Sequence, residues 1–442
     1  MITRLRAIWA DIDASYWFYP GLFAIAALAL ALFTVWLDRT GQTAWLNQVA
    51  LIESARPTGA RSMLTVIAGS MIGVASTVFS ITIAAVAYAS GNYGPRLLNN
   101  FMEDKGNQLS LATFIATFVY AVTVLRTVRG EEESPAVLAA SDPLPGFVPQ
   151  LSLLVAYLMM AVSIMVLVFF LNHIPASIRV NTVLQGIGER LIHDIRKVFN
   201  KPNRGHAAEI RPTGRPIRTE KIGYIQIIDF ERLDRLATKE GGRIELAVRT
   251  GDFVHPDMPL AYWKDEELRS EPPDDAIRSC FALGGMRTPS QDLHFLIDEL
   301  VEIGLRALSP GINDPFTAIT ALHWLGAATA ELGQRDLTRS FGKAEKPEED
   351  RLVLPNDDFA HYVSRGFGSM RPSVAASPNA ALVMFDTLRD AASALNDASR
   401  RQVLEQEGER LMRQARLNLE GPTLELIEAR YHQFRQDMER RP

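Results

Sequence analysis

The stretch "WFYPGLFAIAALALALFTVWL", residues 17 to 37, decides the fold because it contains no charged side chain. About 20 apolar residues, rising 1.5 Å each along a helix, cross the ~30 Å hydrocarbon core of a bilayer. Trp17, Tyr19 and Trp36 stand near its two ends, where aromatic side chains favour the membrane–water interface. The stretch therefore predicts a membrane-spanning helix.

Three further uncharged runs follow it, at residues 63–89, 109–125 and 148–171. A buried helix in a soluble protein can imitate one such run, but four of them cannot be hidden in a soluble core. Residues 1–175 are therefore predicted to form a four-helix transmembrane domain, with the lipid bilayer as the first partner.

The basic residues near the ends of the runs predict the orientation. Arg4 and Arg6 precede the first run, and Arg179 and Arg190 follow the fourth, whereas the connection at 129–147 is mainly acidic. No stretch resembles a cleaved signal peptide. Because the number of runs is even, we expect the N- and C-termini on the same side of the membrane, in the cytoplasm.

One face of the second run consists of small residues only: Ser70, Gly73, Thr77, Ser80 and Ala84. Small residues let helix backbones approach closely, and hydroxyl groups can bond across the contact, which favours a packing seam between helices. A face of this composition can also line a water-filled pore, because bulky side chains would block the path. Both interpretations stay open at this point.

The rest of the chain is expected to be a cytoplasmic α+β region in three parts. Residues 176–216 predict a coupling helix followed by a linker rich in Pro, Gly and Asn. Residues 217–273 alternate polar and apolar residues between turn signals, which predicts a β-rich domain. Within it, "VRTGDFVHPDMPLAYW" (248–263) is similar to the repeat of barrel-sandwich domains. Residues 274–442, beginning with a short helix at "DAIRSCFALG", predict an α-helical domain.

The stretch "ALSPGINDPFTA", residues 307–318, joins two helices of that domain. Pro310 cannot continue a helix and Gly311 can take a positive φ, so the first helix is expected to end there. Asp314 is placed to cap the second helix. The polar residues around this joint are a candidate brace, subunit contact or binding site for an ion or small ligand: Arg287, Gln291, Asp292, Asp298, Arg306, Ser309, Asn313, Asp314 and Thr317. Of these, Arg287 and Asp292 lie far from the joint along the chain. They could come close to the joint only by packing against the neighbouring domain.

Three phrases carry a family resemblance: "PRLLNNF" (95–101), "LATFIATFVYAVTVL" (111–125) and "RALSPGINDPFTA" (306–318). With them, nearly the whole chain resembles the bacterial family of predicted membrane proteins catalogued as domain of unknown function 2254. The resemblance implies the bacterial inner membrane and the two-part layout, and it implies no activity. The chain departs from the family pattern at "NYGP" (92–95), where Phe-Ser-Pro is expected.

The composition excludes several classes of function. A formal net charge of -5 gives no reason to expect a nucleic-acid partner. Cys280 is the one cysteine, so neither an intramolecular disulfide nor a thiolate metal site can form. The eight histidines show no metal-ligand spacing, and the common phosphate-loop, dinucleotide and nucleophile-elbow motifs are missing. We therefore expect no enzyme activity and no cofactor.

These observations favour a homo-oligomeric, pore- or channel-like membrane protein whose cytoplasmic region acts as a regulatory domain or vestibule. The alternative is a membrane-anchored signalling or scaffold protein, whose cytoplasmic domain binds a partner or a small ligand.

Overall fold

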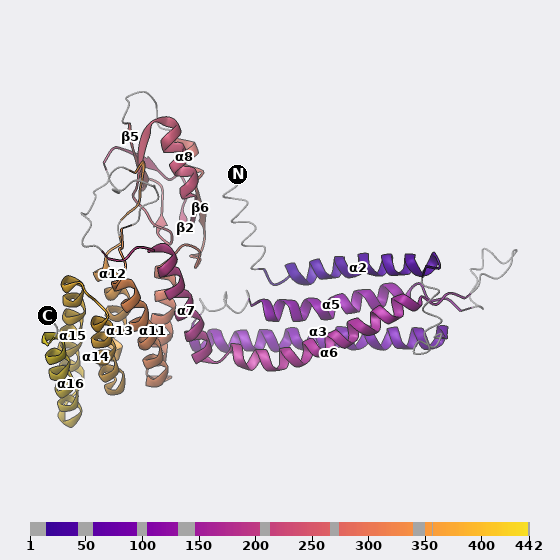
Figure 1. Ribbon diagram of the computed structural model, residues 1–442. Helices are drawn as coiled ribbons and strands as arrows, with labels where there is room; N and C mark the ends of the chain where they lie inside the picture. Colours follow the sequence, from indigo (N-terminus) through magenta and orange to yellow (C-terminus); the bar gives the residue numbers. More distant parts are fainter. Residues whose placement is uncertain are drawn as a thin grey trace. The chain divides into compact units, whose positions relative to one another are not determined.

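The computed structural model describes residues 15–42, 56–94, 104–130, 146–203, 213–265, 274–338, 350–355 and 357–440 (Figure 1). The chain divides between Arg179 and Val180 into two compact units, which we call the membrane unit and the C-terminal body. The "PRLLNNF" phrase and most of the predicted linker lie outside the described residues.

The membrane unit contains four helices that are long and apolar enough to cross a membrane, and they coincide with the four runs predicted as spans. α3 has 37 residues, or about 55 Å, and so extends beyond the predicted run at both ends. α5 begins where the Asp104 carboxylate accepts hydrogen bonds from the backbone N–H groups of Gly106 and Asn107, at 2.7 and 3.2 Å. The four helices are α2 (Phe18–Arg39), α3 (Pro57–Tyr93), α5 (Lys105–Leu125) and α6 (Gln150–Ser177).

α5 is the central helix of the membrane unit, because it packs against α2, α3 and α6. Its Tyr120 hydroxyl lies 2.8 Å from the Thr34 hydroxyl of α2 and donates to the Ser152 carbonyl of α6. Thr117 and Ser163 make a second hydroxyl contact, between α5 and α6, at 2.9 Å. Such polar contacts between helices fix their register in an apolar environment.

The C-terminal body begins with two small sheets that share one apolar core. In the four-stranded sheet the order is β1-β5-β3-β7, and every pair is antiparallel except β3 with β7. In the three-stranded antiparallel sheet the order is β4-β2-β6. The strands and their helices are β1 (Arg215–Arg218), β2 (Gly223–Ile228), α8 (Phe230–Glu240), β3 (Gly242–Leu246), β4 (Phe253–Val254), β5 (Pro259–Asp265), α9 (Asp274–Arg278), β6 (Phe281–Gly284) and β7 (Leu352–Val353).

The sheets extend beyond the boundary predicted at residue 273. The stretch predicted as one short helix, "DAIRSCFALG", is helical only in α9 and then forms β6, which pairs with β2. A short apolar run such as "FALG" fits either a strand or a helix, so its periodicity could not separate the two. The resemblance to a barrel-sandwich domain stays a prediction.

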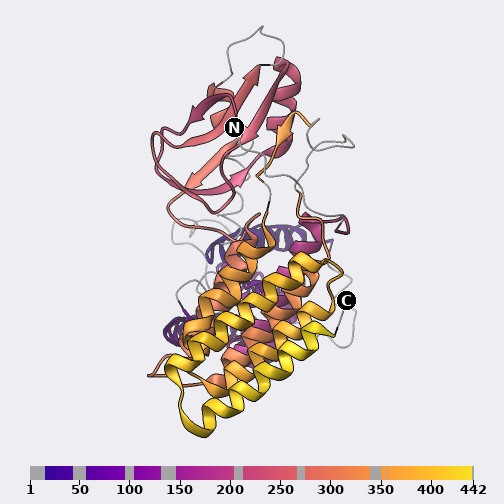
Figure 2. The same cartoon turned by 90° about the vertical axis from the view of Figure 1, so that its left-hand side faces the viewer.

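The rest of the C-terminal body is helical (Figure 2). α11 packs against α7, α10 and α14. α7 falls within the predicted coupling segment, yet it is part of this bundle: Leu184, Ile187, Leu191 and Ile195 are buried. The elements are α7 (Val180–Val198), α10 (Leu293–Ala307), α11 (Pro315–Gly333), α12 (Phe359–Val363), the π-helix η4 (Ser364–Gly368), α13 (Ser369–Val374), α14 (Pro378–Ser393), α15 (Ala398–Asn418) and α16 (Gly421–Glu439).

Candidate functional site

The joint between α10 and α11 is built mainly by its own hydrogen bonds. The Asp314 carboxylate accepts from the backbone N–H groups of Phe316 and Thr317, at 3.1 and 3.2 Å, and from the Thr317 hydroxyl at 2.6 Å. The predicted cap is therefore confirmed. Gly311, by contrast, does not take the expected positive φ: the left-handed residue is Asn313, with φ 49°. Asn is one of the few residues that tolerate this conformation.

The polar side chains on the α10 side of the joint are also satisfied locally. The Ser309 hydroxyl donates to the Arg306 carbonyl at 2.6 Å, and Arg306 lies 3.7 Å from the Glu302 carboxylate one turn earlier. These contacts hold the chain reversal in shape. The joint therefore has the polar chemistry of a structural brace.

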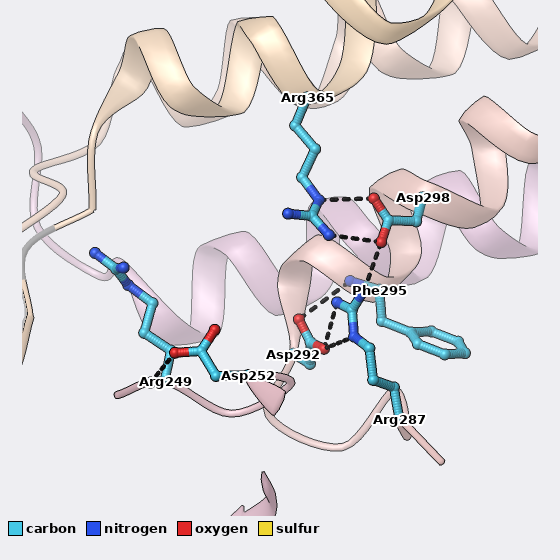
Figure 3. Close-up of polar contacts among 7 residues, drawn as sticks. All are labelled: Arg249, Asp252, Arg287, Asp292, Phe295, Asp298 and Arg365. Carbon is cyan, nitrogen blue, oxygen red and sulfur yellow. Dashed lines mark hydrogen bonds and ion pairs between the residues drawn. The ribbon is translucent and has the colours of Figure 1, made fainter. Parts of the chain in front are cut away.

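A second group of charged residues lies at the other end of α10, and we call Arg287, Asp292, Asp298 and Arg365 the Arg287 cluster (Figure 3). The Asp298 carboxylate accepts from Arg287 Nη1 at 2.6 Å and from Arg365 Nε and Nη2 at 2.6 and 2.7 Å. The Asp292 carboxylate accepts from Arg287 Nε and Nη2 at 3.1 and 2.7 Å. Asp292 also caps α10 by accepting from the Phe295 N–H. The two carboxylates thus hold both guanidinium groups in place.

The Arg287 cluster packs against the sheets, and it stays at the end of α10 that is far from the joint. Gln291, with φ 60°, exchanges two hydrogen bonds with the backbone of Ile228 at the end of β2. Gly251 approaches so closely that a Cβ there would lie 2.0 Å from Asp292 Oδ2. The cluster therefore ties the strand region to the helical bundle within the C-terminal body.

The two carboxylates of the cluster have opposite pKa shifts. Burial by itself would raise the pKa of Asp298, but the hydrogen bonds and charges of Arg365 and Arg287 outweigh it, so the pKa is lowered. For Asp292, burial outweighs the attraction of Arg287 and raises the pKa. Two carboxylates paired with two guanidinium groups satisfy one another, which is the arrangement of a brace rather than of a free acid and base.

The predicted site therefore separates into two groups. α10 has 15 residues, so its ends are about 22 Å apart. Sequence reasoning missed Arg365, because it comes from η4, 67 residues after Asp298, and no local pattern links the two. Within the described ranges, no set of three His, Cys, Asp or Glu side chains is placed to hold a metal ion. The group at the sheet end is Arg287, Gln291, Asp292 and Asp298, and the group at the joint is Arg306, Ser309, Asn313, Asp314 and Thr317.

The small-residue face of α3 points away from the other helices of the membrane unit. All five of its residues, Ser70, Gly73, Thr77, Ser80 and Ala84, are exposed. The opposite face of α3, which includes Leu64, Ile67, Met71 and Val78, is buried in the core around α5. The small face is therefore not a seam with the described helices of its own chain, and is left for lipid, for a second copy or for water.

The three hydroxyl groups of this face already have acceptors within α3. Ser70 donates to the Ile67 carbonyl at 3.1 Å, Thr77 to the Gly73 carbonyl at 3.0 Å and Ser80 to the Ser76 carbonyl at 2.9 Å. Hydroxyls bonded in this way can lie in an apolar contact without an unsatisfied donor. The face can therefore lie in a contact between helices that excludes water, and it can equally border water.

Four apolar helices followed by an α+β body define a multi-pass membrane protein. The chain belongs to the family described as predicted membrane protein (DUF2254), which matches residues 13–390. The resemblance noted from the three phrases is therefore confirmed.

Two curated mycobacterial proteins are similar to this chain. The uncharacterized protein Rv1290c of Mycobacterium tuberculosis is 27% identical over 411 residues, covering 91% of this chain and 76% of that protein. The uncharacterized protein Mb1321c of Mycobacterium bovis matches with the same identity and coverage. No solved structure matches the chain significantly.

Proposed function

We propose that this protein is a homo-oligomeric, channel-like protein of the bacterial inner membrane, in which the small face of α3 lies toward the axis of the assembly. The single observation that carries the proposal is the exposure of that face in the isolated chain. The proposal assigns the protein no catalytic step and no cofactor, and it makes ions or small solutes the species that pass.

The composition of the other exposed membrane surfaces supports this assignment. α2 and α6 expose large apolar side chains, which suit contact with lipid tails. α3 differs because the five residues of its small face are no larger than Thr; among its bulky exposed residues, Ile72 and Phe79 lie on another side, whereas Val66 lies one heptad before Gly73 at the end of the same face. The large exposed residues of α2 and α6 include Ile25, Leu28, Leu32, Phe33, Met165, Val168, Phe169 and Leu171.

Small residues on an exposed helix face favour close approach by another helix. A Cβ built at Gly73 meets no atom within 4 Å, nor does one at Gly69, so both backbones are open to a neighbour. In a ring of copies, part of this face would contact the next α3 and the hydroxyl-bearing part would border the central path. The orientation proposed from the basic residues places the C-terminal body in the cytoplasm, where it would form a vestibule or a regulatory domain.

The test uses single cysteines in the full-length protein after the native Cys280 is replaced by Ser. Thr77→Cys is placed on the small face, and Met165→Cys is the matched control, since its side chain is exposed on α6. In proteoliposomes we expect Thr77→Cys to cross-link between copies and to react with a water-soluble thiol reagent, whereas Met165→Cys does neither. Thr77→Cys that stays monomeric and unreactive would count against the proposal.

Conductance across planar bilayers separates the channel from the scaffold alternative. We expect discrete currents from the purified protein, changed in size by Thr77→Leu, because a larger side chain narrows the path. Silence across ions, voltages and membrane tension, together with cross-linking at Thr77, would support an oligomeric scaffold instead.

A further inference from the structure

The position of the α10–α11 joint along the bundle follows from the packing of α7 on α11. Gly188 of α7 lies directly against Trp324 of α11, since a Cβ there would come within 2.3 Å of the indole ring. Two turns later, Arg196 Nη2 lies 2.8 Å from Glu331 Oε2. The two helices therefore run parallel in nearly constant register. Extending that register back by about two turns brings Val180, the first residue of α7, level with Phe316 in the joint.

The start of α7 is tied to the bilayer by the chain itself. α6 ends at Ser177 and α7 begins at Val180, so three Cα–Cα steps, or at most about 11 Å, separate them. α6 has 28 residues and a length of about 42 Å, which matches a bilayer with its headgroup regions. A spanning α6 thus ends among the lipid headgroups, and α7 starts beside them.

The joint presents an apolar tip at the same end of the bundle as Val180. The side chains of Ile312 and Phe316 are 44% and 71% exposed, and Pro310 and Gly311 beside them are exposed as well. The carboxylate of Asp314 is occupied by its capping bonds. An exposed aromatic and an exposed aliphatic side chain on a rigid turn match the composition of elements that lie in the membrane interface.

We propose that the joint, residues 307–318, docks on the bilayer surface, with Ile312 and Phe316 inserted at the boundary between headgroups and acyl chains. The occupant of the apolar tip is lipid. This gives the phrase "SPGINDPF" (309–316) a role as a second attachment of the C-terminal body to the membrane, besides the chain connection at Val180. The inference does not depend on whether α3 lines a pore.

The test places an environment-sensitive fluorophore on the joint in the full-length Cys280→Ser protein. Phe316→Cys and Ile312→Cys are labelled separately, so that each variant keeps the other apolar side chain. Ile222→Cys is the control, because Ile222 is 69% exposed and lies in the strand region of the C-terminal body. Each labelled protein is reconstituted into phosphatidylethanolamine–phosphatidylglycerol vesicles, with or without lipids that carry a nitroxide quencher on the acyl chain.

We expect blue-shifted emission and quenching by the nitroxide lipids at positions 312 and 316, and neither effect at 222. Adding Ile312→Asp to the label at 316 should reduce the quenching, because a charge resists insertion. Emission at both joint positions that matches the control at 222 would overturn the proposal. Blue-shifted emission without quenching would overturn it too, since it would show that protein, rather than lipid, covers the tip.

Discussion

Replacing Asp298 with Asn tests whether the Arg287 cluster holds the C-terminal body together. The change leaves Arg287 and Arg365 without the charged acceptor of three hydrogen bonds. Exposed ion pairs contribute up to about 1 kcal/mol, whereas breaking a fully buried pair costs about 3–5 kcal/mol. The Asp298 and Arg287 side chains are both 15% exposed and Arg365 is 30% exposed, so we expect an intermediate loss of about 2–3 kcal/mol.

Native-state hydrogen exchange of the α10 amides in the full-length protein measures this loss. A change of 2–3 kcal/mol corresponds to exchange that is faster by roughly 30- to 150-fold. Asp390→Asn is the control, because the Asp390 side chain is 69% exposed and pairs only with its neighbour Arg389 among the ion pairs of the described residues. We expect a change below about 0.5 kcal/mol for the control.

The pH dependence of the same difference gives an independent check. The pKa of Asp298 is lowered, so its pairs stabilise the folded state fully above the ordinary pKa of about 4, and this stabilisation is lost as pH falls through the folded-state pKa. The gap between wild type and Asp298→Asn should therefore be largest near neutral pH and shrink below about pH 4. If α10 exchanges no faster in Asp298→Asn than in Asp390→Asn at neutral pH, the brace interpretation is wrong.

Three further predictions concern single positions in the C-terminal body. Gly251→Ala should lower the stability of this body by about 2–4 kcal/mol, because φ is 91° there and the new Cβ meets a buried carboxylate. Gly285→Ala, which has open space around it, should change the stability by less than about 1 kcal/mol. Thermal unfolding measures both. Gly188→Ala should lower the stability by about 1–3 kcal/mol, because the new Cβ pushes α7 away from Trp324 of α11. Gly186→Ala in the same helix should raise the stability by up to about 1 kcal/mol. Equal effects of the two changes would refute the close contact at Gly188. Burial raises the pKa of the Cys280 thiol to about 11. Its alkylation at pH 8 should therefore be roughly 100-fold slower in the folded protein than in the unfolded chain, because the thiolate is the reactive form. Mass spectrometry follows the reaction.

The membrane spans could be predicted from the sequence because the bilayer imposes a requirement on every residue of a spanning run. Four uncharged stretches in one chain, such as 17–37, cannot all be hidden in a soluble core. The ends of the spans were less accurate: α3 begins at Pro57 rather than at residue 63, because polar residues outside the hydrocarbon core can continue a helix at little cost. The existence of each span is thus a stronger inference than its limits.

The parts that the sequence did not reveal depend on contacts between distant residues. β6 was hidden because its partner strand β2 lies more than fifty residues earlier, and only the pairing makes "FALG" a strand. Arg365 was hidden for the same reason, since its partner Asp298 is on another helix. The cap at Asp314 could be predicted because it is local, whereas the choice of Asn313 over Gly311 as the left-handed residue depends on how the whole joint closes.

The parallel pairing of β3 with β7 has a consequence for how the chain is made. Ile244 pairs with Leu352, so the ribosome adds about a hundred residues after β3 before its neighbour strand exists. At ~5–20 residues per second this delay lasts on the order of 5–20 s. During that time α10 and α11 emerge and can already pack on α7, while the edge of β3 stays open. The part of the bundle formed by α7, α10 and α11 should therefore become resistant to protease earlier in synthesis than the four-stranded sheet, whose last strand follows α11 and precedes the remaining helices of the bundle.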